Sequence, residues 1–235
     1  MSELAKVGRG LDVDISGVGL RLLPHGALYW REEETLIVAD LHLEKASSFA
    51  ARHRVFLPPY DSAATLSALA DLCRGLAPRR VIALGDSFHD SAAPRRLAAR
   101  EAAVIASLQH GRQWIWIAGN HDPSPPDGVG GDHARELAID GLTFRHEPMA
   151  GAAAGEIAGH LHPIGRVRIK GRTIRRRCFA SDGTRMILPA FGALAGGLNV
   201  LDDAFNGLFA GGLSAFLLGE GRVYPIGRRK LLPDA

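Results

Sequence analysis

The chain has 235 residues, of which 46% are hydrophobic and 23% charged, and its formal net charge is +3. A chain of this length and apolar content can bury roughly 70–75% of its unfolded surface, which excludes disorder as its main state and favours a single globular domain over residues 1–235. Its longest uncharged runs are broken by glycines and are shorter than the ~20 apolar residues that cross a bilayer, so no membrane segment and no membrane partner are expected. The first residues lack the apolar core of a signal peptide, and Cys73 and Cys178 lie far apart without a CxxC partner, so we expect a reducing, cytoplasmic location.

Four short apolar runs follow one another along the chain, and each stops at Gly, Asp or Asn. They predict buried strands over residues 36–39, 81–84, 114–118 and 156–158, because they are rich in β-branched and aromatic residues. Apolar residues at helical spacing predict helices over residues 60–74 and 94–110. Strands that alternate with helices indicate an α/β fold with right-handed crossovers.

The second half of the chain favours hairpins. Residues 123–132 predict a surface loop, and residues 142–146 a short strand. Residues 166–179 predict a hairpin that turns at Lys170 and Gly171, and residues 215–218 and 222–224 predict another, because glycine-containing turns separate runs of strand-forming residues.

Polar side chains gather where the predicted strands end. In open α/β sheets, sites form outside the carboxyl ends of the strands, because loops from several strands converge there. Asp40 and His42 are two residues apart, as are His160 and His162, so in an extended chain each pair leaves the same face. The full set is Asp40, His42, Asp86, Asn120, His121, His146, His160 and His162. Carboxylate, imidazole and amide ligands together suit Mn²⁺, Fe²⁺, Co²⁺ or Zn²⁺ rather than Ca²⁺.

Each of these motifs has an ordinary explanation when it is taken alone. An Asp-x-His pair occurs by chance, a Gly-Asp after a strand usually forms a turn, Gly-Asn-His-Asp can cap a helix, and Gly-His-x-His can lie on the surface. All four occur here in order, each after an apolar strand, and a further histidine lies between the last two. A metal site is therefore the better interpretation.

The chain resembles the calcineurin-like, binuclear metallophosphoesterases in the ordered set Asp40-Leu41-His42, Gly85-Asp86, Gly119-Asn120-His121-Asp122, His146 and Gly159-His160-Leu161-His162. The resemblance spans residues 36–162 and implies a four-layer αββα sandwich with two metal ions at the sheet ends. It implies that the first ion is held by Asp40, His42, Asp86 and His162. It also implies that the second is held by Asp86, Asn120, His146 and His160, with Asp86 bridging the two.

A closer resemblance, to the ligase-associated PdeM subfamily, rests on ADLHLEKAS (residues 39–47), LPPYD (57–61), LGDSFHD (84–90) and LPAFGALAGGLNV (188–200). Membership implies a DNA endonuclease and phosphodiesterase loaded with Mn²⁺. It also implies a place in a bacterial DNA-damage response, with DNA, a DNA ligase and a DNA exonuclease as partners. His89 departs from the GDxxD pattern of the broader family but fits the subfamily, and we expect it to contact the scissile phosphate.

The predicted chemistry needs a proton donor beside the metals. Two divalent ions in such a site hold phosphate oxygens and lower the pKa of a bound water toward neutrality. The leaving oxygen must be protonated, and His121 is the candidate donor. Asn120 beside it binds a metal, while Asp122 is expected to orient the imidazole and keep it cationic.

A basic segment follows the last ligand motif. Residues 166–177 read RVRIKGRTIRRR, with Arg166, Arg168, Arg172, Arg175, Arg176 and Arg177. A guanidinium strip beside the site would attract a phosphodiester backbone, although a half-buried hairpin with a solvated face explains the alternation equally well.

The predicted function is therefore a DNA phosphodiesterase. The alternative is a hydrolase of cyclic nucleotides or other small phosphoesters that uses the same metals. A non-enzymatic scaffold is disfavoured, because scaffolds lose ligands and this chain keeps all of them.

Overall fold

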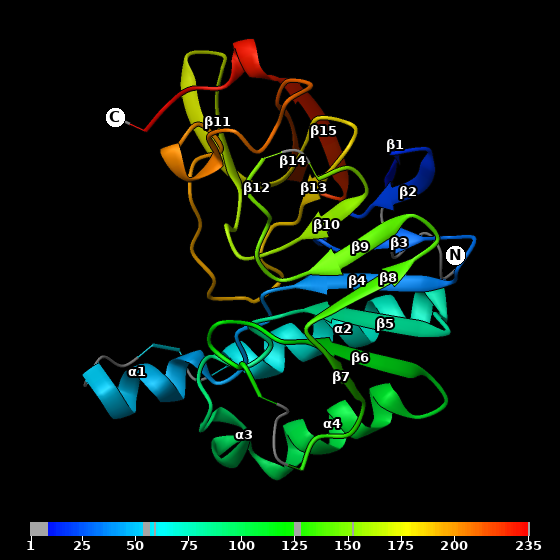
Figure 1. Cartoon of the computed structure of the whole chain (residues 1–235). Coiled ribbons are helices and arrows are strands. Elements are labelled where there is room, and N and C mark those ends of the chain that lie inside the picture. Colours follow the sequence, from blue (N-terminus) through cyan, green and yellow to red (C-terminus); the bar gives the residue numbers. More distant parts are fainter. Residues whose placement is uncertain (1–8, 54–56, 59, 125–127, 152, 235) are drawn as a thin grey trace.

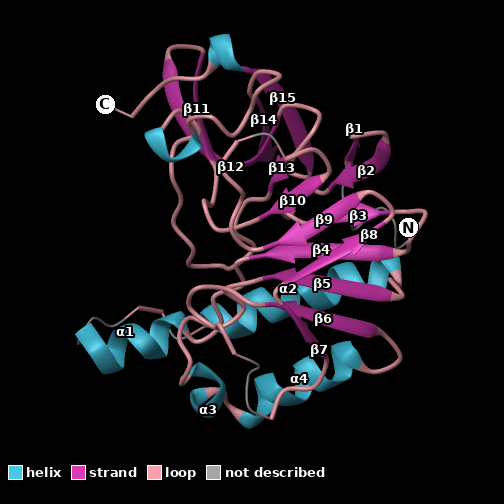
Figure 2. Cartoon of the chain, in the orientation of Figure 1, coloured by secondary structure: helices cyan, strands magenta, loops and turns pink. Residues whose placement is uncertain are grey.

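The computed structural model of the chain describes residues 9–53, 57–58, 60–124, 128–151 and 153–234 (Figure 1). Two β-sheets lie face to face, and the α-helices lie on the outer side of the first sheet (Figure 2). None of the described helices is long and apolar enough to span a membrane.

The first sheet has seven strands in the order β1-β2-β3-β4-β5-β6-β7. They are β1 (Leu11–Ile15), β2 (Val18–Leu22), β3 (Leu28–Trp30), β4 (Thr35–Ala39), β5 (Arg80–Leu84), β6 (Gln113–Ile117) and β7 (Asp132–Ala134). Neighbours from β1 to β4 are antiparallel, whereas β4, β5, β6 and β7 are parallel. The loops that follow β4, β5 and β6 therefore leave from the same edge of the sheet.

In the described part of the chain, four helices accompany this sheet: α1 (Lys45–His53), α2 (Asp61–Leu76), α3 (Ala93–Arg96) and α4 (Ala99–Gln109). The predicted helix over residues 60–74 is confirmed as α2, which buries Leu66, Leu69, Leu72 and Cys73 at helical spacing. The prediction of one helix over residues 94–110 was wrong. Leu97 and Ala98 have extended ψ angles of 124° and 151° and separate α3 from α4.

Tertiary contacts of Arg96 explain this break. Its guanidinium donates to both carboxylate oxygens of Asp90, at 3.1 and 2.7 Å, and to the hydroxyl of Ser47 at 3.0 Å. These contacts hold α3 beside α1, while Ile105 and Leu108 of α4 are buried in the core under the sheet. The chain changes direction between the two attachments.

The second sheet has eight strands, ordered β15-β14-β12-β13-β10-β9-β8, with β11 paired to β12. They are β8 (Glu136–Ile139), β9 (Leu142–Arg145), β10 (Glu156–Ala158), β11 (Ile164–Ile169), β12 (Arg172–Ser181), β13 (Met186–Ile187), β14 (Ser214–Gly219) and β15 (Arg222–Gly227). Both predicted hairpins are confirmed. The first turns at Lys170 and Gly171, whose φ angles of 48° and 78° are typical of a two-residue hairpin loop.

Three clusters of buried side chains hold the layers together. The cluster between the two sheets includes Trp30 and Ile37 from one side and Phe144 and Phe179 from the other. A second lies between the first sheet and the helices, and a third covers the outer face of the second sheet with Phe205 and other apolar residues. The predicted α/β sandwich is confirmed. In the described chain its outermost layer over the second sheet contains only the short turns η2 (Asp203–Phe205) and η3 (Arg228–Lys230) with their loops.

Candidate metal centre

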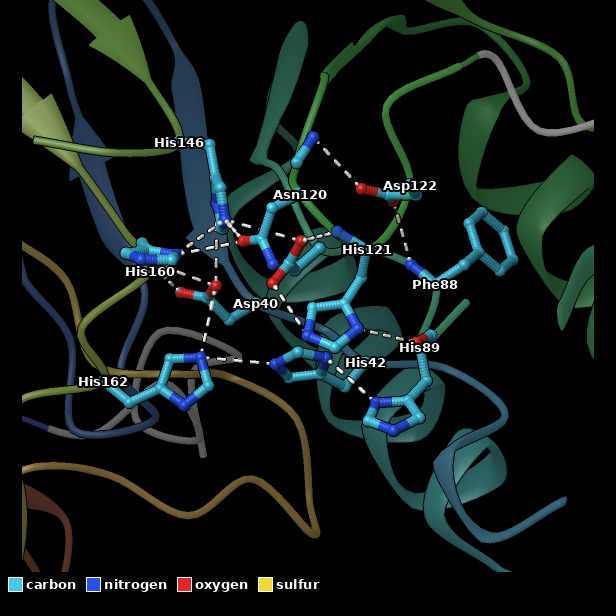
Figure 3. Close-up of polar contacts among 12 residues, drawn as sticks. Asp40, His42, Phe88, His89, Asn120, His121, Asp122, His146, His160 and His162 are labelled. Carbon is cyan, nitrogen blue, oxygen red and sulfur yellow. Dashed lines mark hydrogen bonds and ion pairs between the residues drawn. The ribbon is translucent and has the colours of Figure 1, made fainter. Parts of the chain in front are cut away.

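All the predicted ligands meet at the carboxyl ends of β4, β5, β6, β9 and β10 (Figure 3). Two groups can each hold a cation, with ligand atoms that all lie within 4.8 Å of one another. The first group consists of Asp40, His42 and His162, and the second of Asp86, His146 and His160. The sequence prediction that these six residues come together is therefore confirmed.

The first group surrounds one carboxylate oxygen with imidazole nitrogens. Nε2 of His162 lies 3.2 Å from Oδ1 of Asp40 and 3.2 Å from Nε2 of His42. Asp40 is fully buried and His42 is 5% exposed. Carboxylate and imidazole donors that converge in this way fit a transition-metal ion.

The second group includes Asn120 as well. Its Oδ1 lies 2.9 Å from Nε2 of His146 and 3.1 Å from Nδ1 of His160. Nε2 of His146 is also 3.4 Å from Oδ1 of Asp86. The two groups are neighbours, because Nδ1 of His146 lies 3.7 Å from Oδ1 of Asp40. These contacts assign Asp86 to the second group, and its bridging of both ions stays a prediction.

The backbone of the ligands is left-handed. The φ angles are 54° for Asp40, 45° for His42, 45° for Asp86, 69° for His160 and 46° for His162. The prediction that Asp40 and His42, and likewise His160 and His162, share a face of an extended chain was therefore wrong in its geometry. The side chains of Asp40 and His42 nevertheless converge, whereas His160 and His162 belong to different groups. Residues other than glycine rarely adopt such φ angles, and those that do are concentrated at functional sites.

Two glycines allow the loops to approach so closely. A side chain at Gly119 would collide with the backbone nitrogen and the carboxylate of Asp86. A side chain at Gly192 would collide with the carbonyl oxygen of Leu41. The segment around Gly192 is anchored under the first group, since its N–H donates to the carbonyl of Asp40 at 3.1 Å.

The charges of the site suit a cation. Burial opposes a charge on His146, but its hydrogen bond with Asp86 and the charges of Asp40 and Asp86 raise its pKa to about 9. Although burial alone would raise the pKa of Asp86, contact with His146 lowers it to about 2. Burial and the charge of His162 lower the pKa of His42 to about 2. The carboxylate is thus ionised, and a cation at the second group would replace the proton shared with His146.

A hydrogen bond to the backbone orients His146. Its Nδ1 donates to the carbonyl of Leu84 at 2.9 Å, which leaves Nε2 facing Asp86 and Asn120. Such contacts fix the orientation of a metal-binding imidazole.

His121 is oriented by His89 rather than by Asp122. Nδ1 of His121 donates to the carbonyl oxygen of His89 at 2.9 Å. Nε2 consequently faces the site, 3.9 Å from Oδ2 of Asp86. The side chain of His121 is 40% exposed, so this nitrogen is accessible to a substrate.

The predicted role of Asp122 is wrong. Its carboxylate points away from the imidazole of His121 (Figure 3) and accepts backbone N–H groups from Ser87 at 2.8 Å, Phe88 at 3.0 Å and Gly119 at 3.1 Å. Burial raises its pKa to about 6 in spite of these hydrogen bonds. Asp122 therefore ties the loop after β5 to the loop after β6.

His89 belongs to the same group of rings. Its ring stacks on His121 with centroids 5.1 Å apart, and its Nδ1 lies 3.4 Å from Nδ1 of His42. Burial and the charge of His121 lower the pKa of His89 to about 4. The predicted contact with a scissile phosphate is compatible with this position and stays a prediction.

The six arginines of the basic segment do not form one strip. The register pairs Arg166 with Arg175 and Ile164 with Arg177, so alternation places Arg172 and Arg176 on the opposite face. Arg177 is half-buried and donates to the carbonyl of Ala190 at 2.8 Å. It supports the loop beneath Asp40 and does not face solvent with the others.

Comparisons with known proteins were made for the whole chain. The family model described as calcineurin-like phosphoesterase matches residues 34–180. A search of curated proteins found no match. The chain is similar to the solved structure of nuclease MPE from Pseudomonas putida, with 27% identity, a TM-score of 0.73 and coverage of 93% of this chain and 100% of the nuclease. The similarity to YfcE, a phosphoesterase from E. coli, is weaker, with 13% identity, a TM-score of 0.41 and coverage of 82% and 98%.

Proposed function

The chain belongs to the calcineurin-like phosphoesterase family, and from this premise we propose that it is a two-metal phosphodiesterase that cleaves DNA internally. The observation that carries the proposal is the convergence of seven ligands, five of them with left-handed backbone, into two adjacent groups. The similarity of this chain to a nuclease, along nearly its whole length, supports DNA as the substrate.

The donor set fits two divalent cations, of which Mn²⁺ is our first choice and Fe²⁺, Co²⁺ or Zn²⁺ the alternatives. Asp40, His42 and His162 would hold one ion, and Asp86, Asn120, His146 and His160 the other, with Asp86 reaching both. When bound, the ions supply Lewis-acid stabilisation of the phosphate and a nucleophile at neutral pH.

His121 donates the proton that the leaving oxygen needs. The carbonyl of His89 binds the proton on Nδ1, so Nε2 is the nitrogen available to the substrate. In its protonated form the ring carries a second N–H at Nε2, which faces the site. Asp122 assists indirectly, because it holds the loops that carry Asp86 and Asn120.

We assign DNA binding to the hairpin face that carries Arg166, Arg168 and Arg175. Arg175 donates to the carbonyl of Gly197 at 2.8 Å, and the Cα of Gly197 packs against the backbone carbonyl of His162. This face therefore lies next to the first ligand group. On the strength of the subfamily resemblance, we extend the proposal to a cytoplasmic DNA-damage response with a DNA ligase and a DNA exonuclease as partners.

The test compares substrates side by side. Manganese-loaded protein is incubated with plasmid DNA, single-stranded DNA, cyclic nucleotides and a chromogenic phosphodiester. We expect cleavage of DNA and of the chromogenic diester, and none after chelation. Hydrolysis of cyclic nucleotides without cleavage of either DNA would instead establish the small-phosphoester alternative.

A charge-matched pair of variants tests the DNA-binding face. Replacing Arg166, Arg168 and Arg175 with glutamine should flatten the plot of log affinity against log salt by roughly 0.7–0.9 for each phosphate that the protein no longer neutralises. The control replaces three exposed arginines: Arg74 of α2, Arg79 directly before β5 and Arg100 of α4. Equal loss of DNA binding in both variants would reduce the effect to overall charge and contradict the assignment.

A further inference from the structure

Lys45 lies beside Phe49, whose ring contacts a histidine ring of the candidate site. It is the first residue of α1, three positions after His42, and α1 projects from the body at the left of Figure 1. The ammonium lies 5.8 Å from the centroid of the Phe49 ring. That ring is 5.6 Å from the ring of His89, which stacks on His121. Two aromatic rings, those of Phe49 and His89, therefore connect this positive charge to the proposed proton donor.

Among the described residues, the ammonium of Lys45 forms no hydrogen bond and no ion pair. The carboxylate of Glu44 is occupied by the hydroxyls of Ser47 and Ser62, at 2.7 and 2.8 Å. The carboxylate of Asp61 accepts the N–H of Ala46 at 3.0 Å. These two carboxylates thus hold the loop and the start of α1.

The ammonium is also partly removed from water. Lys45 is half-buried, and burial lowers its pKa although the charge of Asp61 opposes that change. A partly desolvated cation gains more from an approaching anion than a fully hydrated one does.

A purely structural role for Lys45 is the alternative explanation of its position, and the experiment below distinguishes the two. At 5.8 Å, the ammonium is near the ~6 Å limit of a cation–π contact with Phe49. Such a contact would stabilise α1 without any role in the reaction.

We propose that Lys45 binds a non-bridging oxygen of the phosphate that is cleaved, from the α1 side of the site. The inference rests on the proposed phosphodiesterase function. It adds a substrate-binding residue to the metal ligands and to His121. Because Lys45 touches neither group of ligands, its loss should weaken phosphate binding and leave the metals in place.

The experiment uses Lys45→Met, which keeps the length of the side chain, and Lys45→Arg, which keeps the charge. Lys230→Met is the control, because Lys230 is exposed on η3, far from α1 in the fold. Three quantities are measured for each manganese-loaded protein: kcat/KM on a small chromogenic phosphodiester, the affinity for inorganic phosphate by calorimetry, and the manganese content.

Lys45→Met should lower kcat/KM and phosphate affinity about ten- to a hundredfold, the range for a missing hydrogen bond to a charged group. Manganese content should be unchanged, Lys45→Arg should retain most of the activity, and Lys230→Met should match the wild type. Wild-type kcat/KM and phosphate affinity in Lys45→Met would overturn the inference, and so would loss of manganese. If the wild type hydrolyses no phosphoester, the proposed function fails, and the calorimetry still decides whether Lys45 binds phosphate.

Discussion

Asp122→Asn should destabilise the protein by about 1–2 kcal/mol, although it changes the volume of the side chain very little. Asp122 is 8% exposed, and its carboxylate accepts three backbone N–H groups. An asparagine can turn its carbonyl oxygen toward Ser87 and Phe88. Its NH₂ group then faces the N–H of Gly119, so that two donors meet. One unpaired buried donor costs about 1–3 kcal/mol, and the two remaining hydrogen bonds lose the strength that the negative charge gave them. The substitution also removes the cost of burying that charge, which raises the pKa of Asp122, and this gain offsets part of the loss.

Urea unfolding measures this cost, and an unchanged m-value shows that the compactness of the two states has not altered. Kinetics on two diesters then separates the possible roles of Asp122. Because its hydrogen bonds hold the loops of Asp86 and Asn120, activity on nitrophenyl and alkyl leaving groups should fall by the same factor. Stability within about 0.5 kcal/mol of the wild type would refute the reasoning. A defect confined to the alkyl leaving group would instead show that Asp122 acts on the imidazole of His121.

Three further predictions concern the metal bridge, the proton donor and α3. Asp86→Ala should lose both metal ions and all turnover, and two fully occupied metal sites by elemental analysis would exclude Asp86 as the bridge. His121→Ala should keep both ions yet lose about 10²–10⁴ in rate on substrates with poor leaving groups. The loss should be much smaller on a nitrophenyl ester, because nitrophenolate departs without a proton. Equal losses on both kinds of substrate would assign His121 to phosphate binding. Arg96→Gln should lower stability by about 1–3 kcal/mol at pH 7, because it removes the positive charge that pairs with the nearly buried carboxylate of Asp90. Contact with Arg96 outweighs burial and holds the pKa of Asp90 below its usual value. The stability difference between the wild type and Arg96→Gln should therefore shrink as pH falls below about 4. A stability difference as large at pH 3 as at pH 7 would contradict the pairing.

The convergence of the ligands was predictable because it depends on topology alone. Asp40, Asp86 and Asn120 each follow a strand of the parallel part of the first sheet, and such strands end at one edge. No side-chain geometry is needed for that step. The same reasoning could not foresee the left-handed backbone of Asp40 and His42, since it assumed an extended chain.

The role of Asp122 was hidden for a different reason. In the sequence it stands beside His121, and proximity in the chain suggested that it orients that imidazole. In the structure, the loops instead bring the N–H groups of Ser87, Phe88 and Gly119 within hydrogen-bonding distance of its carboxylate. Which backbone donors lie near a carboxylate is known only after the loops are placed.

Two hairpins escaped the sequence analysis although they carry a signal. Ser16 and Gly17 join β1 to β2, and Asp140 and Gly141 join β8 to β9. All four residues have positive φ, as the common two-residue hairpin loops require. The basic hairpin was found, but the strand register was needed to show that Arg172 and Arg176 face away from Arg166.

Diffraction from a manganese-loaded crystal at the manganese absorption edge tests the two-metal site most directly. The geometry predicts two anomalous peaks. One lies among Asp40, His42 and His162, and the other among Asp86, Asn120, His146 and His160, with the carboxylate of Asp86 between them. A single peak, or peaks bound by other residues, would contradict the assignment of the site.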